Sequence, residues 1–279
     1  MNNHKSTVQA TQLPIDKLRP FEGHPFQVKD DAEMEQLIRS IRSQGLLTPI
    51  TVRPIENNEY EVISGHRRLH ACKKAGIETV PALIYCLDRD AATIAMVDSN
   101  LHREKILPSE KAFAYKMKIE AMGHQGVTCG QVGHKSRDLL SDIDSGRQVQ
   151  RYIRLTALIP EILQMVDNGK IALTPAVELS YLTKLDQRDL LETMESEDCT
   201  PSLSQAIQLK RLSQAGELDI DRIFDILREL KANQIDKISF HTADLRKFFP
   251  KSYSAAQIQE TILKLLGDYQ KKRQRENSR

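Results

Sequence analysis

The sequence lacks tryptophan altogether, and aromatic residues make up only 5% of its 279 residues. Glycine and proline are also scarce, with 12 and 11 residues, which excludes a collagen-like or low-complexity chain. An apolar share of 40% beside a charged share of 28% is enough to build packed cores. Length and composition together predict about two domains that are mostly helical.

A strong net charge of either sign is missing too. The chain has 40 basic and 38 acidic residues, a net charge of +2, so any surface for nucleic acid must be a local basic cluster. The four cysteines have no spacing typical of a disulfide framework, which favours a reducing compartment. No apolar run approaches the ~20 residues of a membrane helix, and the polar N-terminus does not resemble a signal peptide. We therefore expect a soluble, cytoplasmic protein that does not enter a membrane.

Hydrophobic periodicity predicts an α+β protein. Residues 10–105 alternate short β-rich runs with helices, and the pattern from residue 106 onward is almost entirely helical. A helix is predicted from about residue 32, capped by Asp30 or Asp31 and ended by Gly45, and two strands flank an Asn-Asn turn at 57–58. The expected domains are a small α/β domain at 10–105, an all-helical domain at 106–215 and a small C-terminal module at 216–279. Within the helical part, Ser109 and Thr200 are predicted as N-caps.

The stretch VISGHRRLHACKKAG, residues 62–76, places Gly65, His66, Arg67 and Arg68 where an apolar strand passes into a helix. The free N–H groups and the dipole of a helix N-terminus favour an anion, and glycine lets a ligand approach the backbone closely. Arginine binds phosphate in a bidentate manner. The stretch therefore suits a nucleoside triphosphate or a phosphodiester, although a solvated basic first turn capped by Ser64 explains the same residues.

A second polar cluster, DSNLHREKILPSEKAFAY, covers residues 98–115. Asn100 and Arg103 stand at the end of one predicted helix, and Glu110 stands at the start of the next. Such a junction can present polar side chains to one pocket, and it is equally well explained as a helix end followed by a capped helix start.

Residues 136–156, SRDLLSDIDSGRQVQRYIRLT, have the spacing of a helix-turn-helix. Leu139, Leu140 and Ile143 would bury the first helix, and Val149 and Ile153 would anchor the second. Arginine reads guanine and glutamine reads adenine in the major groove. An ordinary antiparallel helix pair shares this spacing. The residues expected at DNA are Ser145, Gly146, Arg147, Gln148, Gln150, Arg151 and Arg154.

These stretches, in this order, resemble the ParB/RepB-type partition proteins. SGHRRLHACKKAG resembles the Gly-Glu-Arg-Arg box of that family, and SNLHREKILPSEKAFAY resembles its second box. LPIDKLRPFEGHPF, at residues 13–26, is similar to the family opening, and the helical part up to about residue 185 is similar to the helices around the family's helix-turn-helix. The resemblance implies an N-terminal fold like that of ParB and sulfiredoxin, and it is closest to ParB proteins of mobile elements, plasmids or chromosomes.

The resemblance also implies a pocket for CTP and Mg²⁺. It assigns the triphosphate to Gly65, His66, Arg67 and Arg68, and it places Asn100 and Arg103 at the phosphates, with Asn100 at Mg²⁺. Two positions depart from the family, since His66 and Ser99 stand where the family has glutamate. A neutral histidine or serine holds Mg²⁺ or orients water less well than a carboxylate. The sequence thus favours CTP binding over CTP hydrolysis.

A role as a partition protein would account for all of these features. The protein would bind a centromere-like site on double-stranded DNA as a homodimer, close a clamp around the DNA on binding CTP, and work with a ParA-type ATPase on the nucleoid. Two alternatives stay open: a helix-turn-helix transcription repressor with a vestigial pocket, and a small sulfiredoxin-like enzyme of phosphoryl chemistry. An apolar stripe near the C-terminus predicts either a dimer contact or a core helix, and its members are Ile258, Ile262, Leu265 and Leu266.

Overall fold

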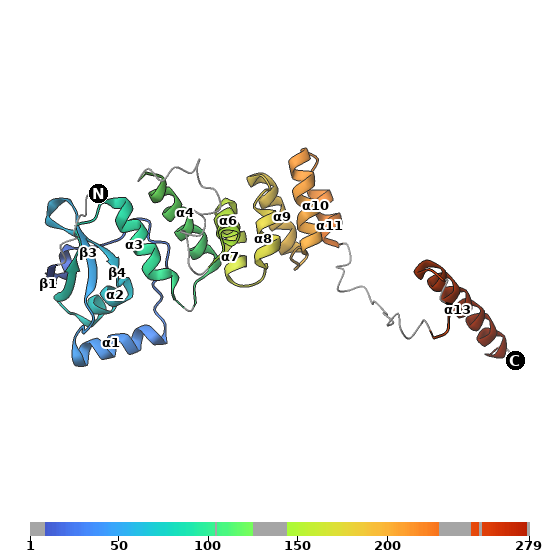
Figure 1. The fold of residues 1–279 in the computed structure, drawn as a ribbon, viewed down its shortest axis with the longest axis horizontal. Helices are drawn as coiled ribbons and strands as arrows, with labels where there is room; N and C mark the ends of the chain where they lie inside the picture. The colour runs from blue at the N-terminus through green and yellow to red at the C-terminus, as the bar shows by residue number, and fades with distance from the viewer. Residues whose placement is uncertain (1–8, 104, 125–143, 229–246, 251–252, 278–279) are drawn as a thin grey trace. The chain divides into compact units, whose positions relative to one another are not determined.

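The computed structural model describes residues 9–103, 105–124, 144–228, 247–250 and 253–277 of the chain. The chain divides into two compact units, residues 1–229 and residues 230–279, which are described separately (Figure 1). The first unit holds a sheet domain followed by helices, and this confirms the predicted α+β class.

The sheet has five strands in the order β1-β5-β3-β4-β2. Two of its pairings are antiparallel, β1 with β5 and β3 with β4, and two are parallel, β3 with β5 and β2 with β4. The strands are β1 (Gln9–Pro14), β2 (Leu18–Pro20), β3 (Ile50–Pro54), β4 (Tyr60–Ser64) and β5 (Thr79–Ile84). The predicted turn between β3 and β4 is confirmed, because Asn57 and Asn58 have φ of 59° and 57°, a conformation that asparagine tolerates.

Helices cover both faces of this sheet. α1 (Ala32–Gln44) and α2 (His66–Ala75) pack on the face that holds Val62, and α3 (Arg89–Leu101) packs on the face that holds Ile63. Neighbouring residues of β4 thus enter different cores, as the two-residue period of a strand requires. α1 begins and ends as predicted, with the Asp31 carboxylate accepting the Met34 N–H at 2.9 Å and Gly45 at a φ of 71°.

The helical part of the first unit follows the sheet domain along the chain (Figure 1), and one buried cluster includes residues of both. Phe26 of the sheet domain, Tyr115 of α4 and Val149 of α6 belong to one buried cluster. The later helices share a second cluster, which includes Ile223 and Ile226, so residues 220–228 pack with the helices before them. The helices are α4 (Pro108–His124), α6 (Gly146–Arg154), α7 (Pro160–Asp167), α8 (Leu173–Leu179), α9 (Lys184–Ser196), α10 (Leu203–Ala215) and α11 (Ile220–Arg228).

Two predicted N-caps were wrong. Ser109 is the second residue of α4, and its hydroxyl and N–H both bind Asp167. Thr200 lies before the cap of α10, which is Ser202. Ser202 forms a capping box with Gln205, and this reciprocal pair fixes the helix start two residues later than predicted.

The second unit contains α13 (Ala255–Asn277). Of the predicted apolar stripe, Ile258 is buried and Ile262 is half-buried, whereas Leu265 and Leu266 are 60% and 58% exposed. The first helix expected of the helix-turn-helix, with Leu139, Leu140 and Ile143, lies outside the described residues. None of the helices described is long and apolar enough to cross a membrane.

Candidate functional site

A cleft of about 1020 Å³ opens between the sheet domain and the start of α4. It is bounded by the loop at residues 27–31, the first turn of α1, one side chain of α2, and residues 102, 103 and 105–107. Among the residues that the structure describes, three carboxylates line it, from Asp31, Glu33 and Glu110. The lysine and arginine side chains described at the cleft are Lys29, Arg67, Arg103 and Lys105. The cleft is therefore a polar, charged site and not an apolar groove.

Arg67 is fixed at the cleft by two carboxylates. Its Nη2 atom lies 3.3 Å from Asp31 Oδ1 and 3.3 Å from Glu33 Oε2. Asp31 is also the N-cap of α1, so this contact ties the first turn of α2 to the first turn of α1. The side chain is only 30% exposed, and its charge is directed into the cleft.

Arg103 is a partly desolvated cation at the opposite wall. Its Cζ lies 5.4 Å from the centroid of the Phe26 ring. Burial lowers the pKa of Arg103, the Glu110 carboxylate acts to raise it, and the Arg67 charge lowers it further. Among the residues that the structure describes, Arg103 forms no ion pair. A cation that has lost water without gaining a counterion favours binding of an anion.

The other predicted phosphate ligands of the Gly-His-Arg-Arg stretch do not line the cleft. Gly65 has a φ of 102°, and a Cβ there would lie 2.9 Å from Ile50 Cγ2, so this position requires glycine for the fold itself. Arg68 donates from Nη1 to the carbonyls of Thr48 and Pro49, at 2.8 and 2.6 Å. In this arrangement Arg68 holds the chain that enters β3 against α2.

Asn100 is also directed into the fold. Its side chain is 3% exposed, and its Nδ2 donates to the Met96 carbonyl at 2.7 Å. The neighbouring Ser99 hydroxyl donates to the same carbonyl at 2.9 Å. Thus, of the six residues predicted to bind nucleotide, the structure brings Arg67 and Arg103 together at the cleft.

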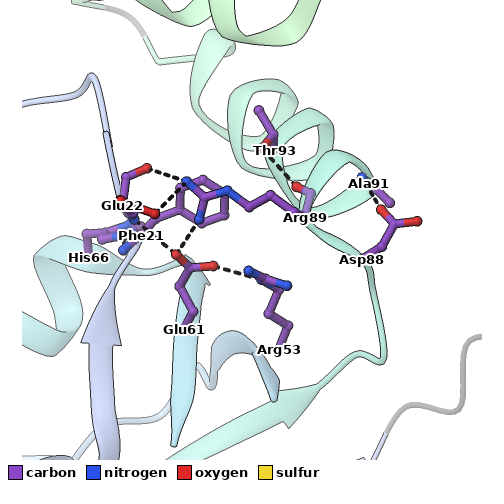
Figure 2. A network of polar contacts seen from close by, with 9 residues as sticks. All are labelled: Phe21, Glu22, Arg53, Glu61, His66, Asp88, Arg89, Ala91 and Thr93. Carbon is purple, nitrogen blue, oxygen red and sulfur yellow. Dashed lines mark hydrogen bonds and ion pairs between the residues drawn. The ribbon is translucent and has the colours of Figure 1, made fainter. Parts of the chain in front are cut away.

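His66 lies buried beside the cleft, at the first position of α2 (Figure 2). Its Nε2 accepts the Phe21 N–H at 3.3 Å, so in the neutral ring the proton resides on Nδ1. Its ring stacks on His24 with 3.7 Å between centroids. Burial lowers the pKa of His66 to about 3, and the charges of His24 and Arg103 act in the same direction. Burial likewise lowers the pKa of His24 to about 4.

A buried ion network holds the segment that binds His66. Glu61 of β4 accepts the Arg53 guanidinium at 2.7 Å, the Arg89 guanidinium at 2.6 Å and the Glu22 N–H at 3.0 Å (Figure 2). Burial acts to raise the pKa of Glu61, but these donors outweigh it and leave that pKa below its usual value. Arg89 also covers the Phe21 ring, with 4.4 Å from Cζ to the centroid. Phe21 is thereby positioned to donate to His66.

The predicted DNA-reading helix is α6. Ser145 is its N-cap and accepts the Gln148 N–H at 3.4 Å, while Gly146 and Val149 are buried. Arg147 and Gln150 are exposed. The residue before the cap, Asp144, accepts hydrogen bonds from Lys111 and Tyr115 of α4, both at 2.7 Å.

The last two arginines of α6 contact the neighbouring helices. Arg151 donates to Gln148 Oε1 at 3.2 Å and to Thr174 Oγ1 at 2.7 Å. Arg154 donates to the hydroxyl and carbonyl of Ser180, and its Cζ lies 3.9 Å from the centroid of the Tyr181 ring. Both contacts connect α6 to α8 and the residues that follow it.

Several cleft residues were not predicted from the sequence. Lys29 and Lys105 have no sequence pattern that marks them as cleft residues. They line the cleft only because two segments distant in sequence meet in the folded chain. Glu110 was placed at a helix start, but its partner Gln27 is 83 residues away in sequence. His24, which does not line the cleft, was not predicted either, because its stacking on His66 joins two distant parts of the sequence.

The buried histidine predicts a stability that depends on pH. The pKa of His66 is lower in the folded chain than its usual 6.5, so its share of stability is complete above pH 6.5 and is lost as the pH falls toward 3. Between those values the free energy of unfolding should fall by about 1.4 kcal/mol per pH unit through His66. The measurement is urea unfolding from pH 7.5 to 4.5, comparing the chain with His66→Gln, whose amide oxygen can still accept the Phe21 N–H. The substituted chain should have the shallower slope, and identical slopes would contradict the assignment.

The N-terminal part of the chain is similar to known proteins. Residues 1–101 match the family described as ParB N-terminal domain. The nucleoid occlusion proteins of Bacillus thuringiensis (strain Al Hakam) and Bacillus anthracis are each 43% identical to this chain over 113 residues. That match covers 40% of this chain and 39% of either relative, so the chain spans about two fifths of the length of the curated relatives it matches.

Solved structures give looser similarities. The C-terminally truncated ParB of Caulobacter crescentus, complexed to the centromeric parS site, is 21% identical, with 79% of this chain and 100% of that chain covered and a TM-score of 0.42. Sulfiredoxin of Arabidopsis thaliana is 26% identical, with 32% of this chain and 97% of that chain covered and a TM-score of 0.28. The match of residues 1–101 and the identity to the nucleoid occlusion proteins thus make the N-terminal part of this chain similar to proteins that carry a ParB N-terminal domain.

Proposed function

We propose that this chain is a DNA-binding partition protein that binds CTP in the cleft beside α2. The observation that carries the proposal is the convergence of Arg67 and Arg103 on one cleft next to the Gly-His-Arg-Arg turn. A triphosphate is the class of ligand that these cations fit, because it supplies several charges to a site that has two cationic walls.

The phosphates would exchange partners with groups that are already in place. Arg67 would turn from the Asp31 and Glu33 carboxylates to a phosphate, and Arg103 would gain the counterion that it lacks among the described residues. Lys29 at the cleft wall adds a further positive charge. The site would then select for an anion with charge spread over several oxygens.

Mg²⁺, when bound, would neutralise part of the phosphate charge. The resemblance assigns it to Asn100, whose buried amide now donates to the Met96 carbonyl. Asn100 must break this bond to reach a ligand in the cleft. The proposal therefore gives the recognition of phosphate to Arg67 and Arg103, and it keeps Asn100 as the metal ligand that becomes available when the junction of α3 and α4 rearranges.

The two departures from the family support binding with weak or absent hydrolysis. His66 is buried and neutral, and Ser99 donates its hydroxyl to a backbone carbonyl. Neither residue presents a carboxylate that could orient water for attack on a phosphate. Bound CTP would thus act mainly as a ligand that holds one conformation of the chain.

The DNA-binding part of the proposal rests on α6. Its N-terminal turn is capped by Ser145, and the exposed Arg147 and Gln150 are available for base edges. Gln148 would join them by releasing the hydrogen bond that its Oε1 accepts from Arg151. We assign Arg151 and Arg154 to the same DNA surface, where their contacts to Thr174 and Ser180 would fix the direction of α6. The names of the curated relatives, nucleoid occlusion proteins, support a role on the nucleoid.

The full proposal follows the resemblance. A homodimer would recognise a centromere-like site, CTP would close the N-terminal domains into a clamp, and a ParA-type ATPase would move the complex. A transcription repressor with a vestigial pocket is the second candidate, and one observation favours it: Arg68 and Asn100 both bind backbone carbonyls of the fold.

Titration calorimetry with CTP, ATP and GTP in the presence of Mg²⁺ tests the cleft. We expect selective binding of CTP, and at least a tenfold weaker affinity for Arg67→Ala because a charge-assisted bidentate contact is lost. Arg39→Ala is the matched control, since it removes the same charge from an exposed position of α1. Absence of binding of any nucleotide, with or without DNA, would leave the repressor as the function.

The base-reading assignment is tested with a duplex selected from a random library by the full chain. Arg147→Ala should weaken binding to the selected site by about 1–3 kcal/mol and affect random DNA less. Arg188→Ala, an exposed arginine of α9, removes the same charge and should weaken both duplexes equally and slightly. If Arg147→Ala weakens both duplexes by the same factor, then Arg147 contacts only the DNA backbone.

A further inference from the structure

Glu110 occupies the cleft in an arrangement typical of a bound anion. Its side chain lines the cleft although the residue is only 8% exposed. Oε1 accepts the Gln27 N–H at 2.7 Å, and Oε2 accepts the Leu107 N–H at 3.0 Å. Within the described ranges no lysine, arginine or histidine nitrogen pairs with this carboxylate. Two backbone amides from opposite walls therefore hold one buried negative charge.

These two amides are the kind of donor that phosphate oxygens use. Leu107 directly precedes the 17-residue helix α4, and its N–H lies at the N-terminal end of that helix, where the helix dipole favours negative charge. Gln27 N–H comes from the loop of the sheet domain that borders the cleft. Burial leaves the pKa of Arg103 lowered, and the nearby Glu110 charge acts against that shift. A phosphate in the cleft would meet the same donors and the same cation.

A phosphate and the Glu110 carboxylate cannot both keep this position. Two negative charges at contact distance repel each other, and the two amides are already occupied by the carboxylate, so one anion must leave. Glu110 is the third residue of α4, and its bond to Gln27 is a direct polar tie between α4 and the loop of the sheet domain. Displacement of the carboxylate would release this tie.

We propose that Glu110 is an internal anion that ties α4 to the loop of the sheet domain at Gln27 and that an anionic ligand in the cleft must displace. The proposal rests on the proposed binding of a nucleoside triphosphate and adds its regulation. Release of Gln27 frees α4 from the sheet domain at this point. The adjacent residue, Lys111, binds Asp144 directly before the cap of α6, so the rearrangement reaches the helix assigned to DNA.

The test compares Glu110→Gln with the full chain and with Glu120→Gln. Glutamine keeps the size of the side chain and one acceptor oxygen but removes the charge. Glu120 is exposed on the same helix, so its substitution gives the same change in net charge away from the cleft. The dissociation constants of CTP with Mg²⁺ and of inorganic triphosphate are measured by calorimetry on each folded protein, with circular dichroism confirming the fold.

We expect Glu110→Gln to bind both ligands about tenfold more tightly, and Glu120→Gln to bind them as the unaltered chain does. Equal or weaker binding of inorganic triphosphate by Glu110→Gln overturns the proposal. Amide hydrogen exchange at Gln27 gives a second readout. Ligand should change the exchange rate of the Gln27 N–H in the unaltered chain, because this N–H loses its Glu110 acceptor, and an unchanged rate overturns the displacement.

Measuring both CTP and inorganic triphosphate distinguishes a failure of this inference from a failure of the proposed function. Tighter binding of triphosphate by Glu110→Gln without any selection for CTP supports the internal anion and contradicts the proposed nucleotide function. Selective CTP binding that is equal in the unaltered chain and Glu110→Gln supports the function and contradicts the internal anion. Absence of binding of either ligand to all three proteins contradicts both.

Discussion

The arrangement of the sheet domain, α6 and α7 in the first unit depends on the contacts made by the first turn of α4. Three consecutive side chains there bind three different parts of the chain. Ser109 binds Asp167 at the end of α7, with 2.5 Å between the Ser109 hydroxyl oxygen and the carboxylate. Glu110 binds the sheet domain, and Lys111 binds Asp144 before α6. Because successive helical residues point about 100° apart, one turn can address three neighbours.

Apolar packing makes this turn a firm junction. Phe26, Tyr115 and Val149, from the sheet domain, α4 and α6, share one buried cluster. Tyr115 also donates its hydroxyl to Asp144, so the same helix supplies both the core and the polar contact. A ligand that alters the polar contacts of Glu110 therefore acts on a helix that is packed against the proposed DNA-reading helix. The proposed clamp needs such a physical connection between the nucleotide cleft and α6.

Local patterns predicted much of the fold because its helix ends and turns are chosen by nearby residues. Asp31 and Gly45 bound α1, and Asn57 with Asn58 forms the turn between β3 and β4. The start of α10 also has a local signal, because Ser202 followed by Gln205 three positions later forms a capping box. The prediction of Thr200 as the cap was wrong because the residue three positions after Thr200 is Leu203, which cannot complete such a pair.

The site was less predictable because its contacts cross long stretches of sequence. The Gly-His-Arg-Arg stretch indicated a phosphate site, but nothing local shows that Arg68 would bind the carbonyls of Thr48 and Pro49 while Arg67 faced the cleft. The stacking of His24 on His66 likewise depends on how the loop after β2 folds back. Residue type gave the chemistry of the cleft, and tertiary packing decided which residues reach it.

If the proposed functions are correct, ligand binding in the cleft and DNA binding at α6 are energetically coupled through α4. The most direct measurement is the dissociation constant of CTP with Mg²⁺ in the absence and presence of a saturating selected DNA duplex, together with the reverse experiment. We expect DNA to change the affinity for CTP by about fivefold or more, and CTP to change the affinity for DNA by the same factor, as linkage requires. Lys111→Met, which removes the bond to Asp144, should bring that factor toward one. CTP affinity that is identical with and without DNA would contradict the account.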